Sequence, residues 1–148
     1  MRFSYKVKDQ LASNKKIYCI DNGFIQAKAF RISPDLGKLT ENTVAIELKK
    51  REMENKIGLY YWKNQQQEEV DFVVKEGAKV KQLIQVCWDI SKEKTKEREV
   101  RALINASKEL KCTELIVINE DFEGEEKASW FGTERRIKFV PLWKFLFE

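Results

Sequence analysis

The chain has 148 residues, of which 43% are hydrophobic and 35% charged, a composition typical of a folded domain and not of a disordered chain. Its 28 basic and 24 acidic residues leave a net charge of +4, which permits nucleic-acid binding without indicating it. No apolar run approaches the roughly 20 residues that cross a bilayer, and the charged N-terminus lacks a signal-peptide pattern. We therefore expect a cytoplasmic protein with no membrane segment.

Histidine is absent, which excludes catalytic sites and zinc sites built on imidazole. The cysteines Cys19, Cys87 and Cys112 are too scattered for a disulfide framework or a zinc cluster, and reduced thiols are expected. A metal site in this chain would have to use carboxylates, carbonyls and water. Those ligands favour Mg²⁺ or Mn²⁺.

The first third of the chain predicts an arm, a strand and a helix. Residues 1–16 are polar and basic and are expected to form an irregular arm, and residues 16–21 (KIYCID) form a short predicted strand. Ser33-Pro34 has the pattern of a helix start, but Gly37 disfavours a helix there. The helix is therefore predicted from Glu41 to about Met53, with an apolar face made by Val44, Ala45 and Leu48.

The rest of the chain predicts a sheet with one helical crossover. Residues 120–134 are acidic and rich in turn residues, and we expect a connector there. Two hairpin-like strands meet at a turn on Glu76-Gly77, before the clearest helix of the chain. The predicted elements are strands 59–63, 70–74, 83–88, 114–119 and 136–140, helix 96–111, and a short helix after Pro141. This order predicts one α/β domain over 1–148, a mixed central β-sheet flanked by α-helices.

Two predicted strands each carry a polar residue within an apolar run: Asp71 in the first and Gln85 in the second. A carboxylate among apolar neighbours is costly to bury unless a metal, a cation or a hydrogen-bond donor pairs with it. Glu41 opens the predicted helix, and Gln85 and Cys87 share one strand face. The oxygens of Glu41, Asp71 and Gln85 could converge at one end of the sheet and hold Mg²⁺ or Mn²⁺.

This layout of a helix Glu, a strand Asp and a Glu/Gln-x-Lys strand resembles the PD-(D/E)XK nuclease superfamily, which has the restriction-endonuclease-like fold. The resemblance assigns metal binding and catalysis to Glu41, Asp71 and Gln85. At the position of the family's catalytic lysine, however, this chain has Cys87. A thiol is mostly uncharged near neutral pH and does not replace an ammonium.

A closer resemblance runs along nearly the whole chain. The segments KKIYCIDNGF, LTENTVAIELKKR, EEVDFVV, LIQVCWDI, TKEREVRALINASKEL, ELIVINEDFE and FVPLWKFL look like a domain of unknown function found at the C-terminus of many archaeal and bacterial AAA+ type ATPases. That family is often described as a degenerate nuclease. The resemblance implies an ATPase core outside this chain, and a winged-helix region whose remnant would lie in residues 1–30. No P-loop is present.

Each site residue also has a structural explanation. Asp71 could pair with a lysine at a strand end, Glu41 could complement the helix dipole, and Gln85 could be a satisfied core amide. Cys87 is more simply explained as a small buried residue than as a nucleophile. The basic run after the site strand is most often a solvated helix face; as an alternative, it would contact phosphate through Lys94, Lys96, Arg98 and Arg101.

The leading functional hypothesis is a degenerate nuclease-fold domain of an ATPase, which binds nucleic acid or a partner surface without efficient cleavage. The second is an active metal-dependent DNA endonuclease, similar to a Holliday junction resolvase, with a relocated lysine such as Lys49, Lys75 or Lys108. The third is a protein-interaction module that forms a homodimer through the apolar C-terminal helix Trp143–Phe147.

Overall fold

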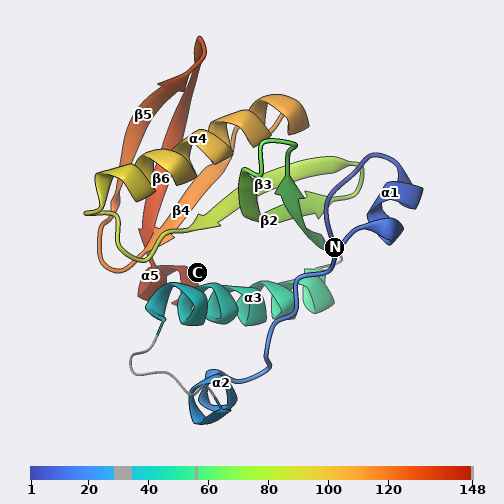
Figure 1. Cartoon of the computed structure of the whole chain (residues 1–148), viewed down its shortest axis with the longest axis vertical. Helices are drawn as coiled ribbons and strands as arrows, with labels where there is room; N and C mark the ends of the chain where they lie inside the picture. The colour runs from blue at the N-terminus through green and yellow to red at the C-terminus, as the bar shows by residue number, and fades with distance from the viewer. Residues whose placement is uncertain (29–34, 56, 148) are drawn as a thin grey trace.

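The computed structural model describes residues 1–28, 35–55 and 57–147. One mixed sheet of six strands has helices packed on both of its faces (Figure 1). The helices are α1 (Val7–Ala12), α2 (Asn22–Lys28), α3 (Leu36–Asn55), α4 (Glu93–Leu110) and α5 (Leu142–Phe147). The strands are β1 (Ile57–Lys63), β2 (Glu69–Glu76), β3 (Lys79–Val86), β4 (Leu115–Asn119), β5 (Gly124–Trp130) and β6 (Thr133–Pro141). The expected α/β class, with a mixed sheet flanked by helices, is confirmed.

The strands lie in the order β1-β2-β3-β4-β6-β5. The first three form antiparallel hairpins, whereas β4 is parallel to both of its neighbours, β3 and β6. A parallel neighbour needs a crossover, and α4 supplies the one between β3 and β4. β5 returns antiparallel to β6 and forms the far edge.

Two apolar clusters fix the helices on the sheet. α4 covers one face with Leu103 and Ile104, and α3 covers the other with Val44 and Leu48. All four of these side chains are buried, as the predicted apolar faces of the two helices require. α5 joins α3 on its face through Phe145. The layers are visible in Figure 1, where α4 and α3 lie on opposite sides of the strands.

The predicted connector over 120–134 is wrong, because β5 lies within it. The side chains of β5 are all exposed or half-buried. An edge strand with neither face fully buried does not need apolar residues at alternate positions. The sequence GEEKASW therefore lacks the pattern by which the other strands were predicted.

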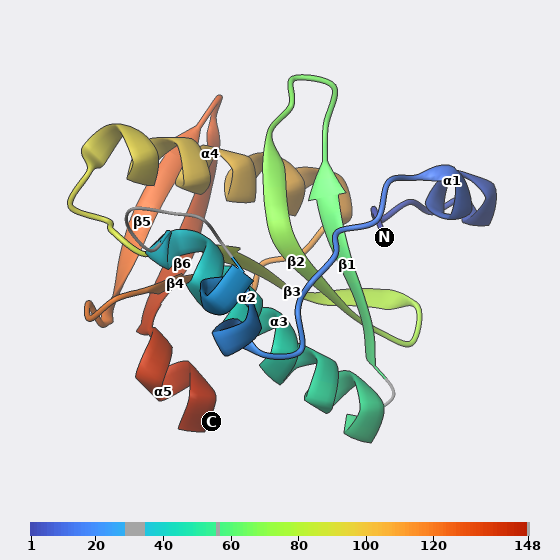
Figure 2. The ribbon, with the colours of Figure 1, turned by 60° about the horizontal axis from the view of Figure 1, so that its bottom comes forward.

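The predicted strand over 16–21 is also wrong. This stretch pairs with no strand, and it passes from α1 across the molecule to α2 (Figure 2). Within the predicted irregular arm, residues 7–12 form the short helix α1, which has no buried residue. The predicted helix start at Ser33-Pro34 lies outside the described residues. In the described part of the chain, no helix has the length and apolar character needed to cross a membrane.

Candidate functional site

A β-bulge directs Asp71 toward the α3 face of the sheet. Tyr60 pairs with Val73 and Trp62 pairs with Val70, so two residues of β2 stand opposite the single residue Tyr61 of β1. Such a bulge changes the direction of the side chain at the extra position. Asp71 consequently lies on the same side of the sheet as Phe72, which packs in the cluster beneath α3.

The Asp71 carboxylate has two different partners. Its Oδ2 accepts a hydrogen bond of 3.0 Å from the backbone N–H of Val86, close to the point where the β2–β3 pairing ends at Phe72 and Ile84. Its Oδ1 accepts a hydrogen bond of 2.8 Å from Lys16 Nζ. The buried carboxylate is therefore paired with a cation supplied by this chain itself.

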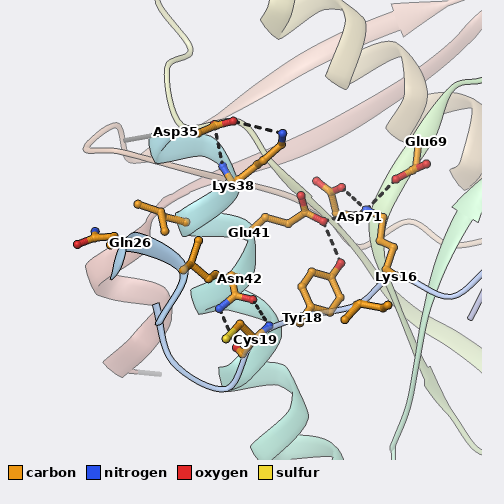
Figure 3. A pocket seen from close by; sticks show the side chains of 13 residues that line it. Lys16, Tyr18, Cys19, Gln26, Asp35, Lys38, Glu41, Asn42, Glu69 and Asp71 are labelled. Atoms are coloured by element: carbon orange, nitrogen blue, oxygen red, sulfur yellow. Dashed lines mark hydrogen bonds and ion pairs between the residues drawn. The ribbon is translucent and has the colours of Figure 1, made fainter. Parts of the chain in front are cut away.

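Lys16 lies at the centre of an acidic cluster formed by Glu41 of α3 and by Glu69 and Asp71 of β2 (Figure 3). Its Nζ is 2.9 Å from Glu41 Oε1, 2.7 Å from Glu69 Oε1 and 2.8 Å from Asp71 Oδ1. The Asp71 side chain is 11% exposed and that of Lys16 is 21% exposed, so water screens these pairs less than it screens surface pairs. Three carboxylates share one ammonium, which leaves an excess of negative charge.

Tyr18 and Asn42 hold the Lys16 segment in place. Tyr18 Oη donates a 2.9 Å hydrogen bond to Glu41 Oε1. Asn42 of α3 accepts from the backbone N–H of Cys19 at 2.7 Å and donates to its carbonyl at 2.8 Å. Alternate residues Lys16 and Tyr18 thus point to the cluster, beside a cavity of about 860 Å³ (Figure 3).

The surroundings of Asp71 favour its protonated form. Burial is the largest cause and the nearby Glu41 charge adds to it, while Lys16 acts in the opposite direction. Together they raise the pKa of Asp71 from 3.8 to about 6. The direction follows from burial, which makes the ionised carboxylate costly and outweighs the attraction of Lys16.

The surroundings also shift the pKa values of Lys16 and Tyr18. Burial lowers the pKa of Lys16, but attraction to the surrounding negative charges, with Asp71 first, raises it well above the ordinary lysine value. Burial also raises the pKa of Tyr18. Lys16 therefore stays charged and Tyr18 stays neutral at physiological pH, which fits an ammonium that pairs and a phenol that donates.

The structure brings Glu41 and Asp71 together, but it does not bring the side chains of Gln85 and Cys87 to them. Gln85 Oε1 accepts from the backbone N–H of Asp71, while its amide nitrogen donates to Glu99 on α4. Cys87 is buried in the cluster under α4. Burial raises the pKa of its thiol to about 11, so it is not a thiolate near neutral pH. Gln85 and Cys87 share one face, but it is the face opposite Glu41.

The basic residues of α4 are largely paired within the domain. Lys96 pairs with Glu126, Arg98 with Glu99 and Arg101 with Glu68. Lys94 is exposed and has no ion pair within the described ranges. Three of the four basic residues predicted to contact phosphate therefore have carboxylate partners within the domain.

The cation beside Asp71 is none of the three lysines that the sequence suggested for that place. Lys49 pairs with Glu52 on α3, Lys75 lies near the far end of β2, and Lys108 lies in the last turn of α4. The cation at Asp71 is instead Lys16, which is 55 residues earlier in the chain. The available signal was the alternation of Lys16 and Tyr18 around Ile17, because alternate residues of an extended segment face the same way.

The oxygen atoms of the cluster have the chemistry that Mg²⁺ and Mn²⁺ prefer. As the described residues stand, however, no three acidic or thiol side chains are placed to hold a metal ion. The Lys16 ammonium lies between the carboxylates that would be the ligands.

Comparison with known proteins assigns most of the chain to one family. The family described as "Domain of unknown function (DUF4143)" matches residues 36–145. This chain belongs to the DUF4143 family. The chain is also similar to the "Uncharacterized protein MJ1544" of Methanocaldococcus jannaschii, with 37% identity over 145 residues. That match covers 97% of this chain and 31% of the relative, so the chain spans about a third of the relative's length. No solved structure matches it significantly.

Membership in DUF4143 places all three acidic residues of the cluster, but not Lys16 or Tyr18, within the segment that matches the family. The similarity to the archaeal relative extends over 145 residues and thus beyond that segment.

Proposed function

We propose that this DUF4143 domain is a nuclease-like domain of a longer protein, which binds a partner and does not cleave phosphodiesters efficiently. The observation that supports this proposal is the position of Lys16, whose ammonium lies within 2.9 Å of three carboxylates. Glu41 on helix α3 and Asp71 on strand β2 also keep the helix Glu and strand Asp on which the resemblance to the PD-(D/E)XK superfamily rests. On this proposal the acidic residues of the site are present, but the ammonium of Lys16 occupies the space between them.

The residues present do not fit the Mg²⁺ or Mn²⁺ that the nuclease resemblance implies, because no three acidic or thiol side chains in the described part of the chain are placed to hold a metal ion. Such a bound metal would supply activation of water for attack on a phosphodiester. With Lys16 in place, the carboxylates are already neutralised in part and their inner oxygens are occupied by N–H donors. Gln85 cannot complete the ligand set, because its amide is bonded to Glu99 and to the Asp71 backbone.

A cleavage assay tests this proposal. Wild-type protein would be incubated with Mg²⁺ or Mn²⁺ and with linear, single-stranded and branched DNA, next to the Asp71→Ala variant. We expect the same background cleavage from both proteins. Metal-dependent cleavage that the wild type shows and Asp71→Ala lacks would contradict the proposal.

An active metal-dependent endonuclease is the second candidate. The contact between Lys16 and Asp71 favours it, because a relocated lysine near the carboxylates is what such an enzyme requires. The two candidates give Lys16 opposite roles. If Lys16 is catalytic, Lys16→Ala abolishes cleavage; if Lys16 closes the site, the same change does not reduce activity.

The surfaces of α4 and α5 favour a protein partner over nucleic acid. Pairing of Lys96, Arg98 and Arg101 with carboxylates speaks against strong nucleic-acid binding through α4. Large apolar side chains are instead exposed at α5, where Trp143 is 59% and Phe147 87% exposed. Those side chains favour contact with protein, either a second copy of the chain or the ATPase region expected in a longer protein. Light scattering measures whether the chain associates with a second copy of itself. A DNA-binding measurement at low salt tests whether nucleic acid is a partner.

A further inference from the structure

The two edge strands of the sheet, β1 and β5, are protected to different degrees. At β1 the pairing with β2 contains a bulge, and residues 1–3 cover part of the outer side, where Phe3 N donates to Tyr61 O at 2.6 Å. β5 pairs with β6 along its whole length without a register shift, and no described residue bonds to its outer backbone. Bulges and covering segments are the means by which proteins block a sheet edge, so β5 is the open edge.

Alternate residues of β5 direct their backbone groups to opposite sides of the strand. The β5–β6 turn contains two residues, so Trp130 and Thr133 form the hydrogen-bonded pair that closes it. Counting back from Trp130, the N–H and C=O groups of Glu125, Lys127 and Ser129 point away from β6. These outward groups are the ones that an added strand would bond.

The side chains of β5 alternate between the two faces of the sheet. Glu126 pairs with Lys96 of α4 and therefore lies on the α4 face. Glu125 and Lys127 lie on the other face and are more than half exposed. Their ion-pair partners on β6 are 3.6 and 3.9 Å away and are also more than half exposed. Exposed pairs of this kind contribute little to stability, so both charges are available to another chain.

A second copy of β5 is complementary to this edge in one antiparallel register. A two-fold axis perpendicular to the sheet keeps the same face up in both copies, so residues opposite each other lie on the same face. With Glu126 at the axis, Glu125 of each copy lies opposite Lys127 of the other, and each Glu126 keeps its own Lys96. Two pairs of opposite charge favour this register. Moving the axis to Glu125 or to Lys127 would place like charges directly opposite each other.

We propose that β5 pairs with β5 of a second copy of this chain, so that two six-stranded sheets form one continuous sheet in a homodimer. The register also places Trp130, which is 36% exposed, opposite position 122 of the other copy, where Phe122 is 39% exposed. A contact built on two seven-residue strands is at the low end of interface sizes, about 1,200 Å² or less, so the dimer dissociates on dilution. The inference does not rest on the proposed function, because β5 and the acidic cluster on β2 lie toward opposite edges of the sheet (Figure 1).

Sedimentation velocity over a range of about 10 μM to 1 mM tests the dimer. Wild type should pass from monomer to dimer over this range. Lys127→Glu places glutamates opposite each other at the axis, and Glu125→Lys places lysines there. We expect each change to weaken dimerisation at least about fivefold. Lys81→Glu is the matched control and should behave as wild type, because Lys81 is also an exposed strand lysine paired with a glutamate but lies on β3.

Mixing the two charge variants tests the register itself. In the mixed dimer the glutamates of one copy lie opposite the lysines of the other, so the mixture should associate more tightly than either variant alone. A wild type that is monomeric at about 1 mM, or a mixture that associates no better than its components, would overturn the proposal. Dimerisation that is kept in Lys127→Glu but lost in Trp143→Ser would overturn it by placing the interface at α5.

Discussion

The balance of charge around Lys16 decides how the site behaves. Three carboxylates surround one ammonium, and burial makes the ionised form of Asp71 costly. The pKa of Asp71 is therefore raised, so this carboxylate takes up a proton at a higher pH than an ordinary aspartate. Because Lys16 is bound to Asp71 and also to Glu41 and Glu69, protonation of Asp71 weakens one of its contacts and leaves the others.

We predict that Asp71 titrates near pH 6, and that stability depends on pH accordingly. Its folded-state pKa of about 6 lies above the ordinary 3.8, so the folded protein binds this proton more tightly than the unfolded chain. The resulting stabilisation is complete below pH 3.8 and is lost as the pH rises through 6. It amounts to about 3 kcal/mol at about 1.36 kcal/mol per pH unit.

Urea unfolding of wild type and Asp71→Asn between pH 4 and pH 7.5 checks this titration, over a range of about four pH units around the predicted value. The free energy of unfolding of Asp71→Asn, relative to wild type, should rise with pH by up to about 3 kcal/mol. Asp9→Asn is the control, since Asp9 is exposed on α1. A relative stability that falls as the pH rises would mean that the pKa of Asp71 is lowered.

Removal of the Lys16 ammonium should destabilise the fold. In Lys16→Met the carboxylates repel each other without a shared cation, and we predict a loss of about 1–3 kcal/mol at pH 7. The loss should be smaller at pH 5, where Asp71 carries its proton. Thermal unfolding at both pH values measures it, with Lys15→Met as the reference. A larger loss at pH 5 than at pH 7 would show that repulsion is not the cause.

Sequence reasoning found half of this cluster. Glu41 and Asp71 were predicted together because a carboxylate inside an apolar strand requires a partner. Gln85 was predicted beside them from its position on the next strand, but the bulge at residues 71–72 of β2 turns Asp71 to one face while Gln85 stays on the other. Whether a strand contains a bulge depends on its pairing with β1, and alternation along β2 alone does not reveal that.

Among the elements, the hairpin β5–β6 shows a local conflict between side chain and backbone. Its two-residue turn has Phe131 at φ 44° and Gly132 at φ 74°. Both residues of such a turn need positive φ, which glycine and asparagine adopt readily and phenylalanine does not. Phe131 is 87% exposed, and its ring lies edge-on to that of Trp130, with ring centroids 5.0 Å apart.

We predict that Phe131→Asn stabilises the protein by about 0.5–1 kcal/mol, because asparagine relieves the strain at positive φ. Gly132→Ala should destabilise it by about 1 kcal/mol for the opposite reason. Urea unfolding of the two variants measures both effects. A loss of stability in Phe131→Asn would show that the contact with Trp130 outweighs the backbone strain.

The elements that sequence patterns predicted are those with a buried face. α4 was predicted from its apolar stripe and β4 from its continuous apolar run, and both are confirmed. β5 was missed, and residues 16–21 were wrongly predicted to form a strand. β5 buries no full apolar face, so its side chains show little alternation between apolar and polar. In residues 16–21 the alternation of Lys16 and Tyr18 reflects contact with the acidic cluster and not pairing with a strand.

At the scale of the whole molecule, residues far apart in the chain meet only because the sheet and α3 bring them together. Lys16 is 25 residues before Glu41 and 55 before Asp71. No local pattern marks such a pairing, whereas the succession of helix and strands from α3 to β4 could be predicted from local periodicity. The fold class was therefore predictable, and the closure of the acidic site by Lys16 was not.

A crystal structure of the wild-type chain grown with millimolar Mn²⁺ tests the closed site most directly, because Mn²⁺ is located by its anomalous scattering. We predict that Lys16 Nζ lies within hydrogen-bond distance of Glu41, Glu69 and Asp71, with no Mn²⁺ peak between them. A Mn²⁺ ion bound to Glu41 and Asp71 in the wild type would contradict an acidic site that is closed by Lys16.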